Sequence, residues 1–424
     1  MSILWLTLGI TVLLCVRVPV AFSFLGPCLA YMWLSGQSLG ASLRLLTQAT
    51  ASFPLLAVPL FILLGVIASK GGIADRLFDF ALALMGRVRG SLGYVSVGVS
   101  LGFSWMSGSA VADAAALGKV QIPAMLRNGY PQSFALGVTG AASLIAPVMP
   151  PSIPAVIFAG LAAVSTGALF AASVVPALLM ALGLCIVVFF LVRRYPDLQT
   201  VPFSKSRVLE TGKRVLGPLG APVIILGGIL SGAFTPTEAA AVGVAYMLLL
   251  CVFYRTLKWR DLPAVLTETA GTSAAVMLIV SSASLLGYIM ARERVPQMLS
   301  EVTFALTDNP TVFLLLVAIL TLILGTAIDP TAILVLTVPI ILPISNQFGV
   351  DPIALGVLMI IANMIGLLTP PVGTVLYVLS AITKAPTGVV FYGSLPFMIP
   401  LLVILGLIIV FPDSLSWLPQ VLGL

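Results

Sequence analysis

The sequence contains no histidine and very little charge. Only 8% of its 424 residues are Asp, Glu, Lys or Arg, whereas 60% are hydrophobic and the mean hydropathy is +1.19. Soluble domains carry about 25% charged residues, so this composition excludes a soluble globular protein and predicts an integral membrane protein. The lack of histidine also excludes a Ser-His-Asp triad and any proton relay built on histidine.

Other signatures of enzymes and of nucleic-acid binding are missing as well. The sequence has no ATP-binding loop, no cluster of metal ligands and no nucleophile beside a base, so we expect neither an enzyme nor an organic cofactor. The net charge of +6 comes from basic residues in a few short loops, which is typical of cytoplasmic anchoring beside a lipid bilayer and does not indicate a nucleic-acid partner. Continuous apolar runs predict membrane helices, since strands of a membrane barrel alternate polar and apolar residues.

Two proline pairs interrupt apolar segments at equivalent positions. Pro150-Pro151 and Pro370-Pro371 are separated by 370 − 150 = 220 residues. The same offset relates Pro123 to Pro343, Gly129 to Gly349 and Pro176 to Pro396. We interpret the chain as a duplicated membrane protein in which each half supplies one broken helix, over residues 131–164 and 352–383.

A break in a membrane helix needs a physical reason. The freed backbone groups are tolerated only where they are buried in protein or line a wet cavity, and carbonyls that face such a cavity can bind a small cation. One break alone is equally well explained as a packing kink. Two breaks at one repeat position, with hydroxyls alongside at Ser152, Thr369 and Thr374, favour binding sites.

Each half also contains an apolar segment with a polar centre. Residues 92–125 are interrupted at Ser107, Gly108 and Ser109 and have basic residues on both flanks, which predicts a re-entrant hairpin that opens to the cytoplasm. Residues 312–344 are interrupted between Gly325 and Pro330 and have acidic flanks, so the second hairpin should open to the opposite side.

These patterns predict an all-α polytopic membrane protein with two inverted repeats, each containing a re-entrant hairpin and a discontinuous helix. Such repeats are the signature of a secondary transporter. We expect both termini on the outer side. The predicted segments are N-terminal scaffold helices with an interfacial arm (1–52), a first repeat (53–192), a cytoplasmic linker (193–215), scaffold helices with a second arm (216–272) and an inverted second repeat (273–424).

Several polar residues have both a structural and a functional interpretation. Ser109 and Asp329 are expected to cap helices, with Pro330 at the first helical position, and any ligand role would be additional. Asp113 is either an acid in the first turn of a helix or an intramembrane functional residue. Arg292 and Arg294 belong either to a solvated outer loop or to a docking patch for an external partner.

Two motifs resemble a known family. Residues 107–118, Ser-Gly-Ser-Ala-Val-Ala-Asp-Ala-Ala-Ala-Leu-Gly, and residues 366–373, Gly-Leu-Leu-Thr-Pro-Pro-Val-Gly, are similar to the large membrane subunit of tripartite ATP-independent periplasmic (TRAP) transporters. The resemblance covers essentially the whole chain. It implies an elevator-type, Na⁺-driven importer of small organic acids, carboxylates or sialic-acid-like, in the bacterial inner membrane. It also implies two partners, a four-helix small membrane subunit and a periplasmic substrate-binding protein.

The same resemblance implies where the ligands bind: Na⁺ between each hairpin tip and the neighbouring helix break, and substrate between the two. The implied ion-binding residues are Ser107, Gly108, Ser109, Pro147, Met149, Gly325, Thr326, Asp329, Gly366 and Thr369. The implied substrate-binding residues are Asp113, Pro150, Ser152, Pro370 and Thr374, and the implied docking residues are Arg292 and Arg294.

Two other functional classes remain open at this point. A stand-alone dicarboxylate or anion transporter of the same superfamily would share the hairpins and breaks but need no binding protein. A membrane scaffold or an intramembrane enzyme is the second alternative, and an enzyme would need a paired catalytic constellation, which we do not find.

Overall fold

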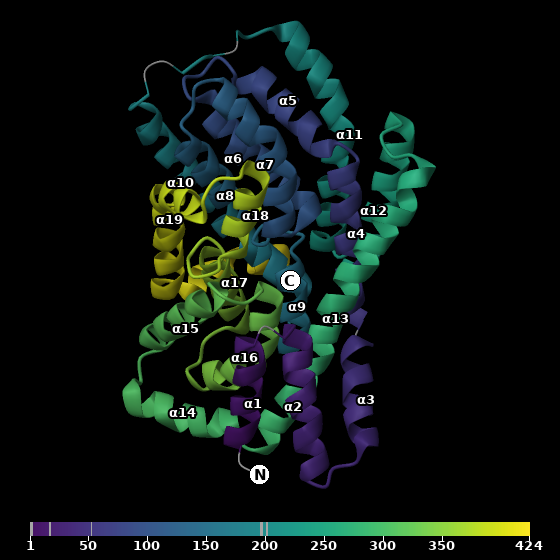
Figure 1. Ribbon diagram of the computed structural model, residues 1–424, viewed down its shortest axis with the longest axis vertical. Helices are drawn as coiled ribbons and strands as arrows, with labels where there is room; N and C mark the ends of the chain where they lie inside the picture. The colour runs from purple at the N-terminus through teal and green to yellow at the C-terminus, as the bar shows by residue number, and fades with distance from the viewer. Residues whose placement is uncertain (1–2, 17, 52, 196–197, 201) are drawn as a thin grey trace.

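The computed structural model describes residues 3–16, 18–51, 53–195, 198–200 and 202–424. Every regular element in these ranges is a helix (Figure 1). Six of the described helices are long and apolar enough to cross a membrane, and up to eight are if each of two bent helix pairs forms one span. The chain is therefore an all-α polytopic membrane protein.

The second half of the chain repeats the helices of the first half. For α7 (Ala110–Arg127) and α16 (Pro330–Gln347), the first residues differ by 330 − 110 = 220, and the other pairs lie close to this offset. These pairs are α2 (Val20–Leu34) with α12 (Pro236–Tyr254), α5 (Ile73–Met85) with α14 (Val295–Leu306), α6 (Ser91–Ser107) with α15 (Pro310–Gly325), α8 (Gln132–Ser143) with α17 (Pro352–Gly366), α9 (Ile153–Ala162) with α18 (Thr374–Thr383), and α10 (Thr166–Val192) with α19 (Thr387–Val410).

The two repeats point in opposite directions. In the first, the open end of the α6–α7 hairpin lies beside the end of α10, where the Arg89 guanidinium donates to the Tyr195 carbonyl at 3.3 Å. In the second, the open end of the α15–α16 hairpin lies beside α14, where the ring of Phe348 stacks on Phe304 and Phe313 with centroids 4.3 and 4.6 Å away. Figure 1 shows the first hairpin in the upper part of the molecule and the second in the lower part. The predicted inverted repeats are confirmed.

Local chemistry sets the tip of each hairpin. The helix α6 ends at Gly108, which has a φ of 58°, and α7 begins after Ser109, whose hydroxyl oxygen accepts from the Ala112 amide at 3.4 Å. In the second hairpin, α16 begins after Asp329, whose Oδ1 accepts from the Thr331 amide at 2.9 Å. The capping roles predicted for Ser109 and Asp329 are confirmed.

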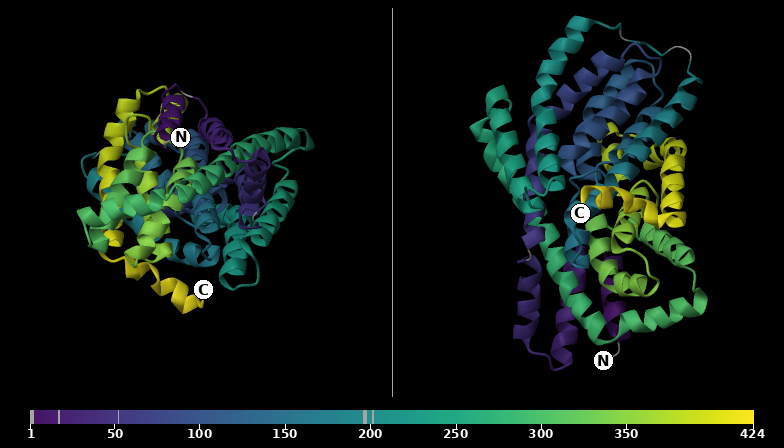
Figure 2. Two further views of the ribbon diagram at one scale, coloured as in Figure 1. Left: turned by 90° about the horizontal axis from the view of Figure 1, so that it is seen from below. Right: turned by 180° about the vertical axis from the view of Figure 1, so that it is seen from behind.

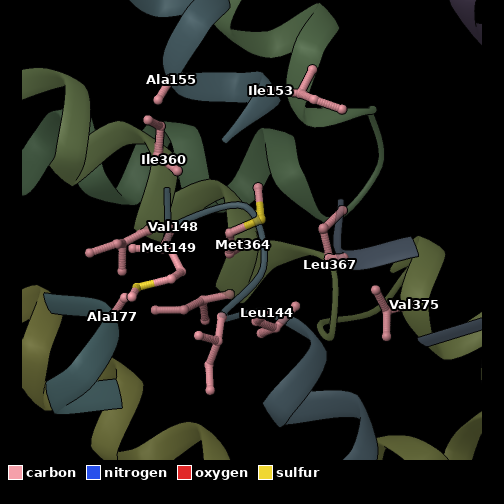
Figure 3. Close-up of a cluster of buried hydrophobic side chains, with 14 of the residues drawn as sticks. Leu144, Val148, Met149, Ile153, Ala155, Ala177, Ile360, Met364, Leu367 and Val375 are labelled. Atoms are coloured by element: carbon pink, nitrogen blue, oxygen red, sulfur yellow. The ribbon is translucent and has the colours of Figure 1, made fainter. Parts of the chain in front are cut away.

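The two helix breaks pack against a common apolar cluster. Both proline pairs lie in the breaks, between α8 and α9 and between α17 and α18, and both Pro–Pro peptide bonds are cis. Figure 3 shows Met364 of α17 between Val148 and Met149 of the first break and Leu367 at the second. All four side chains are buried. The two repeats therefore share one core at the level of their breaks.

Glycines allow the repeats to approach closely where α8 crosses α19. A methyl group built on Gly137 would overlap the Gly393 carbonyl, and one built on Gly393 would overlap the Ser133 carbonyl. Beside this crossing, the rings of Phe134 and Phe397 meet edge to face with centroids 5.7 Å apart. Small residues at helix crossings are the usual way in which membrane helices pack backbone against backbone.

A long helix, α13 (Leu262–Arg292), runs along α2, α3 (Leu39–Thr50) and α4 (Ala57–Lys70). The Ser281 hydroxyl donates to the Leu46 carbonyl at 3.0 Å, and Lys70 forms an ion pair with Glu268 at 2.6 Å. Seen from below (Figure 2, left), α11 (Lys205–Leu230) and α12 lie on one side of the molecule and α19 on the other. The remaining helices are α1 (Ile3–Cys15), η1 (Phe53–Leu56), η2 (Trp259–Asp261), η3 (Pro412–Leu415) and α20 (Trp417–Leu422).

Two predicted segment boundaries differ from these helices. The second arm, expected to end at residue 272, is an internal part of α13, because no proline interrupts the chain between Pro263 and the end of this helix. The predicted linker 193–215 is shorter, because Ser204 accepts from the Arg207 amide at 3.5 Å and starts α11 at Lys205. The boundary predicted at residue 52 falls outside the described residues. As a division into scaffold and repeats, the ranges stay predictions.

The inverted hairpins predict opposite labelling of two positions. Arg127 is the last residue of α7, at the open end of the first hairpin, and Asp351 follows α16 at the open end of the second. In a variant whose four native cysteines are replaced by alanine, Arg127→Cys should react with an impermeant maleimide only from the cytoplasmic side and Asp351→Cys only from the outer side. Right-side-out and inside-out membrane vesicles provide the measurement. Labelling of both positions from the same side would contradict the inverted orientation.

Candidate functional site

A cavity of about 800 Å³ lies between the two hairpin tips and the long helices beside them. Ser107, Gly108 and Ser109 of the first tip line it together with Asp329 of the second. Its other walls come from α4, α7 and α13, and it also reaches four charged residues, Lys70, Asp75, Lys119 and Glu268. The two tips, distant in sequence, therefore share one space.

The first tip lies directly against the first break, and we call this contact the first junction (residues 107–109 and 144–152). A methyl group built on Gly108 would come within 2.9 Å of the Pro151 carbonyl oxygen. The Ser152 hydroxyl donates to the Pro147 carbonyl and accepts from the Ala155 amide at 3.2 Å, so it caps α9. The approach of tip and break leaves room only for glycine at residue 108.

The second junction (residues 325–330 and 366–373) is built in the same way. The Thr326 carbonyl accepts from the Val372 amide at 3.0 Å and from the Gly373 amide at 2.8 Å. A methyl group built on Gly366 would come within 2.6 Å of the Gly325 carbonyl carbon, so the ends of α15 and α17 are in backbone contact. The Thr369 hydroxyl donates within its own segment, to the Ile365 carbonyl at 3.0 Å.

At each junction two helices end and two helices begin. The last carbonyls of α6 and α8, or of α15 and α17, have partial negative charge and suit a cation. The first amides of α7 and α9, or of α16 and α18, have partial positive charge and suit an anion. Each junction can therefore hold a small cation and an anionic group close together, and the two junctions have opposite orientations.

The overall sequence decides the family. A family model described as "Tripartite ATP-independent periplasmic transporter, DctM component" matches residues 7–414. The chain belongs to this DctM family. The DctM-family match spans both repeats, so the duplicated architecture and the cavity between the tips are features of one continuous family domain.

Named relatives of this DctM-family chain are transporter permeases. It is 41% identical to the sialic acid TRAP transporter large permease protein SiaM of Vibrio cholerae, over 96% of each chain. It is 40% identical to the C4-dicarboxylate TRAP transporter large permease protein DctM of Pseudomonas aeruginosa, over 89% of each chain, and 33% identical to the 2,3-diketo-L-gulonate TRAP transporter large permease protein YiaN of Escherichia coli, over 95% of this chain and 96% of that protein. These names indicate transport rather than enzymatic catalysis.

A solved transporter structure shares the fold. The YdaH transporter of Alcanivorax borkumensis superimposes with a TM-score of 0.60 over 87% of each chain, at 18% sequence identity. At this identity the likeness extends to the architecture alone. It supports the arrangement of helices described above for the DctM-family chain.

The cavity brings together only part of the predicted ion-binding set. Ser107, Gly108, Ser109, Pro147 and Asp329 line it. The other five, Met149, Gly325, Thr326, Gly366 and Thr369, lie at the junctions without lining the cavity. Five of the predicted ion-binding residues thus line the cavity, and the other five lie in the junctions outside its lining.

None of the predicted substrate-binding residues lines the cavity. Asp113 is fully buried and its Oδ1 accepts from the Ser107 hydroxyl, so it lies within the first hairpin. Pro150 and Ser152 are buried in the first break, whereas Pro370 is exposed at the second. The Thr374 hydroxyl is buried and has no hydrogen-bond partner among the described residues.

The predicted docking residues lie on the surface at the end of α13. Arg292 and Arg294 are exposed, and the carboxylate of Glu293 between them accepts from the Tyr31 hydroxyl at 2.5 Å. This bond ties the end of α13 to α2. The two guanidiniums therefore extend from an anchored helix end.

Two features of the site were not predicted from the sequence. Lys70 and Lys119 both reach the cavity, and Lys70 is paired with Glu268. Asn363, on α17, is fully buried, and neither polar atom of its side chain has a partner among the described residues. An amide inside an otherwise apolar run, three residues before Gly366, was the available sequence signal.

The close fit of the first junction predicts a cost for any side chain at Gly108. The residue has a left-handed φ of 58° and faces the Pro151 carbonyl, so Gly108→Ala should lower the free energy of unfolding by about 1–2 kcal/mol. Gly98→Ala is the matched control, because Gly98 lies in α6 with no described atom within 4 Å of a built Cβ. That change should leave stability unchanged or raise it by up to about 1 kcal/mol. Thermal unfolding followed by tryptophan fluorescence tests both, and equal shifts would contradict the close fit.

Proposed function

We propose that this DctM-family permease imports small organic acids together with Na⁺, and that it receives the acid from a periplasmic binding protein. A small four-helix membrane subunit completes the transporter in this proposal. The permease lies in the bacterial inner membrane with both termini on the periplasmic side. The observation that carries the proposal is the shared cavity, which both hairpin tips border from opposite directions.

The junctions support Na⁺ as the coupling ion. Na⁺ prefers oxygen ligands and can be held by backbone carbonyls at the ends of interrupted helices. In our proposal one Na⁺ binds at the first junction, through Ser107, Gly108, Ser109, Pro147 and Met149. A second binds at the second junction, through Gly325, Thr326, Asp329, Gly366 and Thr369.

The cavity supports an anionic substrate. The helices α7 and α16 begin at its edge, and their free amides attract a carboxylate. The side chain of Lys119 adds a positive charge on the same wall as α7. The relatives are named for sialic acid, C4-dicarboxylates and 2,3-diketo-L-gulonate, all of which contain carboxylate groups. In our proposal Asp113, Pro150, Ser152, Pro370 and Thr374 complete the binding site when the hairpins move.

The contact between α4 and the first tip supports an elevator movement. A methyl group built on Gly65 would lie 3.2 Å from the Ser107 carbonyl, so helix and tip meet through backbone without an interlocking side chain. In the proposed movement the hairpins and broken helices travel as one body past α4 and α13. The cavity lies along this boundary.

Transport should require every component of the proposed system. In proteoliposomes, uptake of a labelled organic acid is expected only with an inward Na⁺ gradient, the small subunit and the loaded binding protein together. Arg292→Glu with Arg294→Glu should weaken productive docking about tenfold, which corresponds to about 1.4 kcal/mol. The control is Arg255→Glu with Arg260→Glu, two exposed arginines before the start of α13.

Two results would contradict this assignment. Full uptake by the permease without the binding protein would favour a stand-alone transporter. Normal uptake by the Arg292→Glu, Arg294→Glu variant would reduce the two arginines to a solvated surface.

Asp329 allows its structural and ionic roles to be separated. Because Asn caps helices about as well as Asp, Asp329→Asn should change the free energy of unfolding by well under ~1 kcal/mol. Loss of the carboxylate charge beside Na⁺ should cost about 1.4 kcal/mol of ion binding, which raises the Na⁺ concentration for half-maximal uptake about tenfold. Asp329→Ala should lose both cap and charge. An unchanged Na⁺ dependence in Asp329→Asn would leave this residue with the cap alone.

A further inference from the structure

The side chain of Asn363 lacks the partners that a buried amide normally has. Asn363 lies in the last turn of α17 and is 0% exposed. Its Oδ1 and Nδ2 are both inaccessible, and neither has a hydrogen-bond partner among the described residues. A buried amide without partners costs about 1–3 kcal/mol, so such a group in a native protein calls for an explanation, and a bound ion or water is one.

The amide lies where two helices end. Its Oδ1 is 3.3 Å from the position that a Cβ would take on Gly325, the last residue of α15. Gly366, the last residue of α17, contacts the same Gly325 backbone. The Thr326 carbonyl is already occupied by the two amides of the second break. Asn363 therefore adds a side-chain oxygen to a group of C-terminal carbonyls that favours positive charge.

The first repeat has no equivalent of this amide. The position related by the offset is 363 − 220 = 143, and the Ser143 hydroxyl donates to the Gly140 carbonyl within its own helix at 2.8 Å. Beside the first junction, Oδ2 of Asp113 on α7 is a buried side-chain oxygen without a partner among the described residues. The two junctions therefore differ in the type of side-chain oxygen and in the helix that carries it.

We propose that Asn363 Oδ1 is a ligand of the monovalent cation at the second junction, and that the first junction takes no ligand from the equivalent Ser143. The inference rests on the proposed Na⁺ coupling. An amide oxygen is a hard, neutral ligand, suited to a small hard cation such as Na⁺. The two cation sites are consequently unequal, although the helices around them are related by an inverted repeat.

Thermal unfolding of the purified full chain, titrated with NaCl against KCl at constant ionic strength, tests this proposal without transport. Wild-type protein should be stabilised specifically by Na⁺. Asn363→Leu keeps a similar volume but removes both polar atoms, so it should match or exceed wild-type stability in K⁺ and need about tenfold more Na⁺ for half of the stabilisation. Asn363→Asp retains the oxygen and should keep the wild-type midpoint within about threefold. Ser143→Ala is the matched control and should leave the Na⁺ midpoint unchanged.

The outcomes separate the inference from the function on which it rests. A Na⁺ midpoint for Asn363→Leu equal to that of wild type would overturn the ligand role and leave Na⁺ coupling intact. An Asn363→Asp variant as insensitive to Na⁺ as Asn363→Leu would also overturn it. If wild type itself shows no Na⁺-specific stabilisation, both the inference and the proposed coupling fail. Should Asn363→Leu not fold, Asn363→Ala gives the same comparison of Na⁺ midpoints.

Discussion

A backbone amide or carbonyl without a partner is costly inside a membrane, and each Pro–Pro break creates several of them. The fold resolves this by placing a hairpin tip against each break. Two amides of the second break donate to the Thr326 carbonyl, and the first break is buried beside Gly108. Helix ends also carry carbonyls without partners in their own helix, and for this reason we place the proposed cation sites at the interruptions of the chain.

Inversion of the repeats brings these two places together. Because the hairpins enter from opposite ends, their tips border one cavity. The breaks share an apolar cluster, and α8 crosses α19 through Gly137 and Gly393 without intervening side chains. The hairpins and broken helices of the two repeats thus form one tightly packed body. The helices α4 and α13 lie beside this body and line the cavity together with the hairpin tips.

Local sequence signals predicted the breaks, the hairpin tips and the caps at Ser109 and Asp329, because proline and capping chemistry act within a few residues. Two boundaries were missed although their causes are also local: no proline interrupts α13 after Pro263, and the Ser204 hydroxyl caps α11 in a segment rich in charge. Other features depend on tertiary packing and could not be read from the sequence. The positions of two polar side chains depend on such packing. Asp113 is buried within the hairpin and does not line the cavity, and Asn363 is buried although it lies in an apolar run of the sequence.

The helix α13 has a counterpart in the first repeat that is not a single helix. Subtracting 220 from its bounds gives residues 42–72 (262 − 220 and 292 − 220), which cover α3, the short η1 and α4. Pro54 lies in this interruption, whereas α13 has proline only at Pro263, in its first turn. The second repeat therefore has one continuous helix, α13, where the first repeat has α3, η1 and α4. Duplication preserved the path of the chain, but one long helix in the second half is matched by three shorter helices in the first.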